Sequence, residues 1–125
     1  NGSFDCAVKP ANIEHETFNF FRASVDGIDT KENRLIEIKC PGKDDHQKAL
    51  DGIVPEKYMP QCQWQLMVTG FKEMHYVSYD IKKKEMKVVE LLRDEDMIKE
   101  LVSNGFFFWR MVLEARESVS KNSLF

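Results

Sequence analysis

The apolar positions of this chain recur with two periods, every second residue in some segments and every third or fourth in others. Residues 34–40, 74–79 and 86–91 alternate apolar with polar or charged side chains, which is typical of half-buried strands. A further strand is expected near residues 18–25, whereas the segment up to about residue 11 looks ragged. The pattern therefore predicts four strands, the last two joined by a lysine-rich hairpin.

Helical signals separate and follow these strands. Pro55 fits the first turn of a helix and Gly70 its C-terminal stop, with a shorter helical turn expected at 46–50. Asp94 is expected to cap a long closing helix. Its apolar positions recur at helical spacing: Ile98, Leu101, Val102, Phe108, Trp109 and Val112. We therefore expect a single α/β domain over residues 1–125, whose 42% hydrophobic content suffices for one modest core.

The strand at 34–40 carries the residues of greatest chemical interest. Glu37 and Lys39 point to the same face of it, because strand side chains alternate. Two charges on a half-buried strand are costly unless something pairs with them. A divalent metal held by Asp26 and Glu37, with Lys39 beside it, would offset that cost and make a site for cutting phosphodiesters. The alternatives are an amphipathic strand with a solvated face, and Asp29 in place of Asp26 as metal ligand.

Four sequence blocks occur in order with compatible spacings: Ser24-Val-Asp-Gly-Ile, Glu37-Ile-Lys-Cys-Pro, Tyr58-Met-Pro-Gln-Cys-Gln and Val68-Thr-Gly. Together they resemble the lambda-exonuclease or YqaJ-type phage recombination nucleases of the PD-(D/E)xK superfamily, over roughly residues 12–115. The resemblance implies a restriction-endonuclease-like core, with a central mixed β-sheet flanked by helices. Val25 replaces the proline of the superfamily motif. The helices that usually precede the first strand in this family are expected to be absent here.

The resemblance also implies a role for each matching residue. Asp26 and Glu37 would be the metal-binding carboxylates, and the backbone carbonyl of Ile38 would add a third oxygen. Lys39 would lie at the nucleophilic water, and Gln61 would orient that water or the scissile phosphate. The expected cofactor is Mg²⁺, with Mn²⁺ as a substitute, because Mg²⁺ prefers oxygen ligands and is usually held by one or two carboxylates.

Contacts with nucleic acid are expected around this site. Tyr58 and Gln65 lie on one stripe of the helix between Pro55 and Gly70, where amides and a hydroxyl suit phosphate oxygens. A solvated position for Gln65 is an equally open interpretation. The remaining expected DNA contacts are Arg22, Ser24 and Lys43.

Composition restricts the class of protein further. The net charge of −3, from 18 basic and 21 acidic residues, argues mildly against tight DNA binding by this chain alone. A local excess of basic groups is still expected near the site, from Arg22, Lys39, Lys43 and Lys48. The three cysteines, Cys6, Cys40 and Cys62, lack paired spacing and are expected to be reduced thiols of a cytoplasmic protein. No apolar run approaches the length of a membrane span.

The function expected from these observations is that of a Mg²⁺-dependent DNA nuclease. By resemblance, it is a 5′-to-3′ exonuclease on linear double-stranded DNA, acting as a ring-like homo-oligomer, commonly a trimer, with a single-strand annealing or recombinase partner. Two alternatives remain: a structure-selective or nicking endonuclease, and a non-catalytic DNA-binding fragment of such a nuclease. The aromatic block at 106–109 is interpreted as core or a subunit contact, with base stacking as the alternative.

Overall fold

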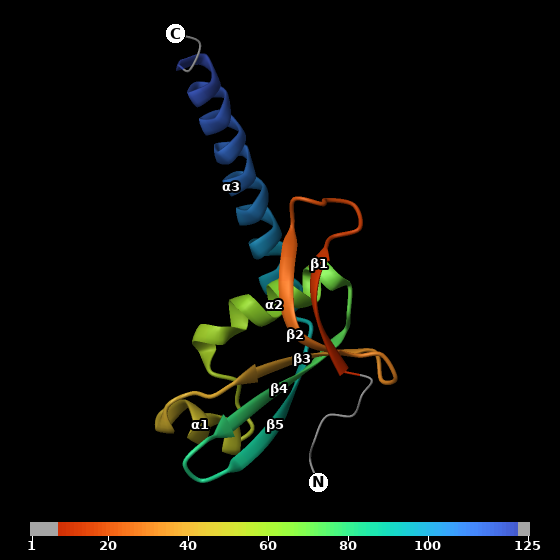
Figure 1. Ribbon diagram of the computed structural model, residues 1–125, viewed down its shortest axis with the longest axis vertical. Coiled ribbons are helices and arrows are strands. Elements are labelled where there is room, and N and C mark those ends of the chain that lie inside the picture. The colour runs from red at the N-terminus through yellow and green to blue at the C-terminus, as the bar shows by residue number, and fades with distance from the viewer. Residues whose placement is uncertain (1–7, 123–125) are drawn as a thin grey trace.

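Five strands form one mixed sheet in which neighbours in the chain are also neighbours in the sheet (Figure 1). The structure, a computed structural model, describes residues 8–122. Its strands are β1 (Val8–Glu14), β2 (Arg22–Asp29), β3 (Arg34–Lys39), β4 (Glu73–Asp80) and β5 (Glu85–Leu92). Its helices are α1 (Lys43–Leu50), the 3-10 turn η1 (Glu56–Tyr58), α2 (Met59–Thr69) and α3 (Glu95–Asn122). This confirms the predicted α/β class and mixed sheet flanked by helices.

One pair of strands, β3 and β4, is parallel, and the other neighbours are antiparallel. A parallel pair needs a long crossover, which α1, η1 and α2 provide. Both α1 and α2 cover the same face of the sheet. On this face Met74 packs with Leu66 of α2, and Tyr76, two residues along β4, packs with Ala49 of α1. Gly70 ends α2 in the left-handed conformation, with φ of 76°, as the sequence predicted.

The strands β2 and β3 pair along only part of their length. Their register joins Gly27–Asp29 to Arg34–Ile36 and goes no further toward the start of β2. From there β2 continues beside β1, and Figure 1 shows β2 and β3 diverging. We call this point, where Ser24–Gly27 separates from Ile36–Ile38, the fork. At the fork, the backbones of β2 and β3 are no longer joined by hydrogen bonds of the sheet.

The predicted positions of the first two strands were wrong. The segment expected to be ragged forms β1, an edge strand that tolerates Pro10, because an edge residue need not donate to a neighbour. The strand expected at 18–25 begins only at Arg22. Residues 15–21 form a turn instead, in which the His15 ring accepts the backbone N–H of Thr17 and of Phe18, each at 3.1 Å.

The closing helix α3 begins where the sequence predicted. Asp94 Oδ1 accepts the backbone N–H of Met97 at 3.1 Å and so caps the first turn. Ile98 is buried against Phe21, and a Cβ at Gly105 would lie only 3.0 Å from the Phe21 ring. The second half of the helix extends away from the sheet (Figure 1).

The apolar periodicity of α3 did not predict burial along its whole length. Phe108, expected on the core side, is 65% exposed. Within the aromatic block, Phe106 packs on Phe18, and Trp109 stacks on Phe20 with the ring centroids 4.8 Å apart. These two contacts join α3 to the turn that precedes β2, but Phe106, Phe107 and Phe108 are all exposed, so the block as a whole is not core in this structure.

Candidate active site

Glu37 lies at the centre of a polar cluster between β3 and α2. Its side chain is 5% exposed, and its Oε1 accepts a hydrogen bond from Gln65 Nε2 at 3.1 Å. Its Oε2 accepts one from Gln61 Nε2 at 3.1 Å and lies 3.3 Å from Lys39 Nζ. Lys39 Nζ in turn donates to Gln61 Oε1 at 3.1 Å. Glu37, Lys39 and Gln61 thus form a closed triangle.

Local structure explains this convergence. Glu37 and Lys39 are two residues apart on β3 and so share the helix-covered face. Gln61 and Gln65 are four residues apart on α2 and so lie on one side of the helix. The strand and the helix each bring two polar side chains to the line along which they meet. The sequence analysis expected Glu37, Lys39 and Gln61 at the site, but it expected Gln65 to contact nucleic acid.

Asp26 lies on β2 at the fork, and its side chain closes part of the gap between the strands. Its Oδ2 accepts the backbone N–H of Ile38 at 2.8 Å, a residue that lies beyond the β2–β3 register. Asp26 is exposed, and its negative charge acts on the buried Glu37. The two predicted carboxylates are therefore neighbours, one inside the protein and one at its surface.

The surroundings of Glu37 disfavour its charged form, although the Lys39 ammonium lies beside it. Burial raises the pKa of Glu37 above its ordinary value, and the negative charge of Asp26 raises it further. The hydrogen bond from Gln65 and the Lys39 ammonium act in the opposite direction and do not cancel these effects. A cation between Asp26 and Glu37 would remove the repulsion and favour the ionised form.

The residues present fit a hard divalent cation. Among residues 8–122, no group of three or more His, Cys, Asp and Glu side chains gathers as a metal site. The two carboxylates of Asp26 and Glu37 suit Mg²⁺ in number, because this ion uses one or two carboxylates, keeps several waters and takes further oxygens from phosphate. Burial, with the charge of Glu37, raises the pKa of the Cys62 thiol to about 12, so Cys62 stays protonated.

The cysteines otherwise agree with their expected reduced state where the structure describes them. Cys40 is exposed and Cys62 buried, and both are free thiols. Cys6 lies outside the described residues.

Tyr58 joins the cluster from the turn before α2. Its ring lies beneath the Lys39 ammonium, with Nζ 4.8 Å from the ring centroid. Lys57 Nζ lies 5.3 Å from the same centroid and is paired with Asp45 at 2.6 Å. The Tyr58 ring thus lies close to two ammonium groups at the edge of the Glu37 site.

The expected role of Gln65 needs correction. The residue is 2% exposed, so its amide cannot contact nucleic acid in this structure. Instead its Nε2 donates to Glu37 and, at 2.8 Å, to the backbone carbonyl of Ser24. The helical spacing placed Gln65 on the stripe with Tyr58 and Gln61, but it did not show that this part of the stripe faces the sheet.

The side chains of Arg22 and Ser24, two other expected DNA contacts, bond to residues of β1. Arg22, four residues before Asp26 along β2, lies roughly 13 Å from it at the usual strand rise. It pairs with Glu14 at 3.2 Å. Ser24 is exposed and donates to Asn12 at 2.6 Å. These two residues lie on the β1 side of the fork.

Lys43 and Lys48, the other basic residues expected near the site, both lie on α1. Lys43 is exposed at the start of the helix, and Lys48 Nζ lies 3.8 Å from Asp45. Asp29, the alternative metal ligand, accepts the N–H groups of Lys31 and Glu32 in the β2–β3 turn. Asp29 therefore stabilises the hairpin, away from the fork.

A second polar cluster, which the sequence did not indicate, lies on the same face of the sheet and is buried except for the Glu85 side chain, which is 43% exposed. His46 of α1 is 3% exposed. Its Nδ1 lies 2.7 Å from Ser78 Oγ, and its Nε2 lies 2.9 Å from Glu85 Oε1. We call these three residues the His46 cluster, and Asp26, Glu37, Lys39, Gln61 and Gln65 the Glu37 cluster.

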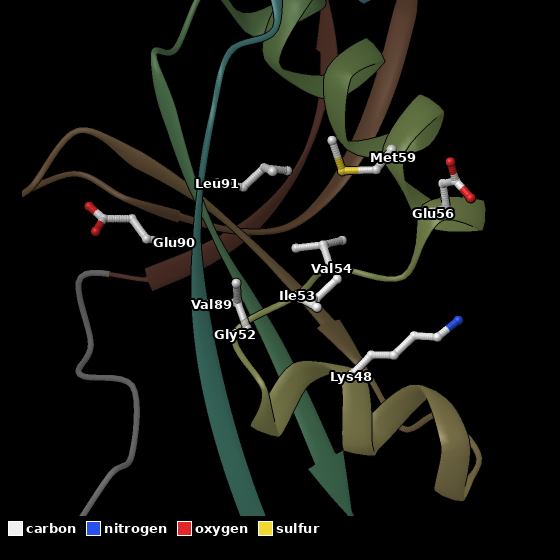
Figure 2. Close-up of a pocket in the computed structure, with 9 residues that line it drawn as sticks. All are labelled: Lys48, Gly52, Ile53, Val54, Glu56, Met59, Val89, Glu90 and Leu91. Carbon is white, nitrogen blue, oxygen red and sulfur yellow. The ribbon is translucent and has the colours of Figure 1, made fainter.

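A hollow of about 580 Å³ lies between α1, the start of α2 and β5 (Figure 2). Its lining is largely apolar, and Figure 2 shows the charged ends of Lys48 and Glu56 pointing outward from it. Its lining residues are Lys48, Gly52, Ile53, Val54, Glu56, Met59, Val89, Glu90 and Leu91. No member of the Glu37 cluster lines it, so this hollow is separate from the candidate site.

Comparison with known proteins agrees with these motifs and this fold. Residues 5–72, more than half of the chain, match the model of the YqaJ-like viral recombinase domain. No match was found among curated protein sequences. A crystal structure of LHK-Exo in complex with dAMP is 28% identical, with a TM-score of 0.79 over 93% of this chain. A crystal structure of the alkaline exonuclease LHK-Exo from Laribacter hongkongensis is 26% identical, with a TM-score of 0.78 over 94% of this chain.

This chain covers 62% and 64% of those two solved chains, so it spans less than two thirds of their length. Among the described residues, no helix is both long enough and apolar enough to cross a membrane. The matched family model and the shared fold identify the chain as a member of the YqaJ-like viral recombinase domain family.

Proposed function

We propose that this chain forms, as one domain, the active site of a metal-dependent DNA exonuclease. The observation that carries the proposal is the triangle of Glu37, Lys39 and Gln61, which lies beside Asp26 at the fork. LHK-Exo, which shares the fold, is described as an alkaline exonuclease and was crystallised with dAMP. A deoxynucleotide is the product expected when an exonuclease shortens DNA.

Each side chain of the site has a role that its position supports. Asp26 and Glu37, with the carbonyl of Ile38, would hold Mg²⁺ or Mn²⁺. When bound, such a metal polarises a phosphate oxygen and lowers the pKa of a bound water. Lys39 places a positive charge beside Glu37, where it can stabilise the charge that develops on the phosphate. Gln61 holds Glu37 and Lys39 at a fixed separation.

Finer features of the proposal come from the family resemblance. They are 5′-to-3′ polarity, linear duplex DNA as substrate, a homo-oligomeric ring and a single-strand annealing or recombinase partner. Tyr58 is a proposed DNA contact because it is half-buried beside Lys39 at the site. Lys43 is another, because it is exposed at the start of the adjacent helix α1. Arg22 and Ser24 are proposed to contact DNA on the β1 side of the fork.

Digestion of end-labelled linear duplex DNA tests the proposal, with closed circular duplex as the comparison substrate. Both are incubated with Mg²⁺ or with EDTA, using the wild type and Lys39→Ala. We expect the wild type to digest the linear substrate but not the circle, and to do so only with Mg²⁺. The Lys39→Ala variant should digest neither substrate. Cutting of the circle would replace the exonuclease with an endonuclease that uses the same residues. Cleavage that persists in EDTA or in Lys39→Ala would contradict the proposed site.

A further inference from the structure

Gln65 is a buried polar residue whose contacts all lead to the candidate site. Its side-chain amide donates one hydrogen to Glu37 Oε1 at 3.1 Å and the other to the Ser24 carbonyl at 2.8 Å. Both partners are acceptors, so only an NH₂ group satisfies them. The other end of the amide, Oε1, is buried and finds no hydrogen-bond partner among the described residues. An orphaned buried acceptor is unfavourable, and the two bonds of the NH₂ group offset it.

These two bonds cross the fork. Glu37 belongs to β3, and Ser24 precedes Asp26 by two residues on β2, in the part of β2 that no longer pairs with β3. The side chain of Gln65 therefore joins the two strands where their backbone ladder is absent. The bond from Ile38 N–H to Asp26 Oδ2 joins them a second time. Together these links set how far apart the two carboxylates stand.

We propose that Gln65 is a positioning residue of the active site, which fixes the Glu37 carboxylate and its distance from Asp26 for a divalent cation. It acts through Glu37 and Ser24 and contacts neither DNA nor metal. The inference rests on the proposed function, because it assigns Gln65 a role toward the metal that Asp26 and Glu37 would hold. Loss of such a supporting hydrogen bond commonly weakens metal affinity or activity by about 10- to 100-fold.

The chain offers a matched control on the same helix. Gln63 is also buried, at 0% exposure, and also makes two hydrogen bonds with its side-chain amide. Its Nε2 donates to the Leu92 carbonyl at 3.0 Å, and its Oε1 accepts the N–H of Asp94 at 2.9 Å. These contacts hold the junction between β5 and α3, away from Glu37. Gln63→Leu therefore has a comparable structural cost without any contact with the site.

The experiment compares Gln65→Leu, Gln63→Leu, Glu37→Gln and the wild type. Mn²⁺ affinity is measured by titration followed by electron paramagnetic resonance, and Tm, kcat and KM for linear duplex DNA are measured alongside. Both leucine variants should lower Tm. Of the two leucine variants, only Gln65→Leu should weaken Mn²⁺ binding, by about tenfold, and lower kcat while KM for DNA stays at the wild-type value. If Gln65→Leu does not fold, Gln65→Met, which is unbranched and similar in length, replaces it.

The outcomes separate this inference from the proposed function. Wild-type Mn²⁺ affinity and kcat in the Gln65 variant, with Glu37→Gln binding Mn²⁺ weakly, would overturn the positioning role and leave the metal site intact. An equal loss of Mn²⁺ affinity in the Gln63 and Gln65 variants would also overturn it, because the loss would then follow stability. Wild-type Mn²⁺ affinity in Glu37→Gln would contradict the proposed function itself, and the role of Gln65 with it.

Discussion

Two polar clusters lie side by side on the helix-covered face of the sheet, and they differ in how their charges balance. Glu37 and Lys39 on β3 pair in register with Tyr76 and Ser78 on β4, so the Glu37 cluster adjoins the His46 cluster. In the His46 cluster each ring nitrogen has one partner, at 2.7 and 2.9 Å. In the Glu37 cluster Lys39 pairs with Glu37, while burial and the negative charge of Asp26 keep the pKa of Glu37 raised.

This difference distinguishes a structural cluster from a functional one. The polar groups of the His46 cluster satisfy one another and tie α1 to β4 and β5, which is what stability requires. The Glu37 cluster has an unbalanced negative charge, an exposed edge at Asp26 and an orphaned acceptor on Gln65. Such groups are unfavourable in the folded chain alone, and a cation bound between Asp26 and Glu37 would stabilise the two carboxylates.

The largest expected effect is on catalysis. Lys39→Ala should lower kcat by about 10²- to 10³-fold, because it removes a positive charge aimed at the reacting phosphate. His46→Gln, in the neighbouring cluster, should retain wild-type kcat at temperatures well below its Tm. Steady-state digestion of linear duplex DNA measures both. Equal losses in the two variants would show that the clusters do not differ in function.

The next effect is on stability. His46→Leu should lower the free energy of unfolding by about 2–3 kcal/mol, since it leaves Ser78 Oγ buried without its partner and releases Glu85. Urea denaturation, monitored by circular dichroism, measures this change. A loss below about 0.5 kcal/mol, the size of an ordinary surface effect, would mean that the His46 cluster does not hold α1 to the sheet.

A smaller effect depends on pH. The folded-state pKa of Glu37 lies above its ordinary value of 4.5, so ionising this group costs the folded state more than the unfolded one. The wild type therefore loses stability as the pH rises through 4.5 toward the folded-state pKa. Glu37→Gln cannot ionise and escapes this loss.

In EDTA, the Tm of Glu37→Gln relative to that of the wild type should rise by a few degrees between pH 4 and pH 8. The difference is compared between the two pH values because the amide also replaces an acceptor of the Gln61 or Gln65 NH₂ group, a cost that does not depend on pH. Differential scanning calorimetry measures it, and a Tm difference that is the same at both pH values would show that the Glu37 cluster is already balanced without a cation.

The smallest effect concerns DNA affinity. Lys43→Ala should weaken duplex binding several-fold, independently of sequence, and reduce the salt dependence of binding by about one counterion. Lys99→Ala, at an exposed position on α3, is the control and should leave both quantities unchanged. Fluorescence anisotropy over a series of salt concentrations measures them. If both variants changed the salt dependence of binding equally, Lys43 would have no specific contact with DNA and α1 would not be part of the DNA-binding surface.

The strand period was sufficient to bring Glu37 and Lys39 to one face, whereas the place of Gln61 at the site came from the family resemblance and not from the helical period alone. Periodicity could not show that Gln65 is buried, because a stripe of polar residues does not reveal which part of it the sheet covers. It also missed β1, since the edge strand contains Pro10 and few β-branched residues.

The His46 cluster was invisible for a different reason. Ser78 is 32 residues from His46 in sequence and Glu85 is 39, and no motif spacing links them. Only the packing of α1 on β4 and β5 brings these side chains together. Contacts of this range depend on the whole fold, whereas all residues of the Glu37 cluster except Gln65 lie within the sequence blocks that carry the family resemblance.

A crystal structure of the protein soaked in Mn²⁺, with anomalous scattering recorded at the manganese edge, would show directly whether Asp26 and Glu37 hold a metal ion. We expect an anomalous peak at the fork, within about 2.0–2.2 Å of carboxylate oxygens of both residues. A peak at His46 and Glu85 instead, or none at the fork under saturating Mn²⁺, would contradict the assignment of the Glu37 cluster as the metal site.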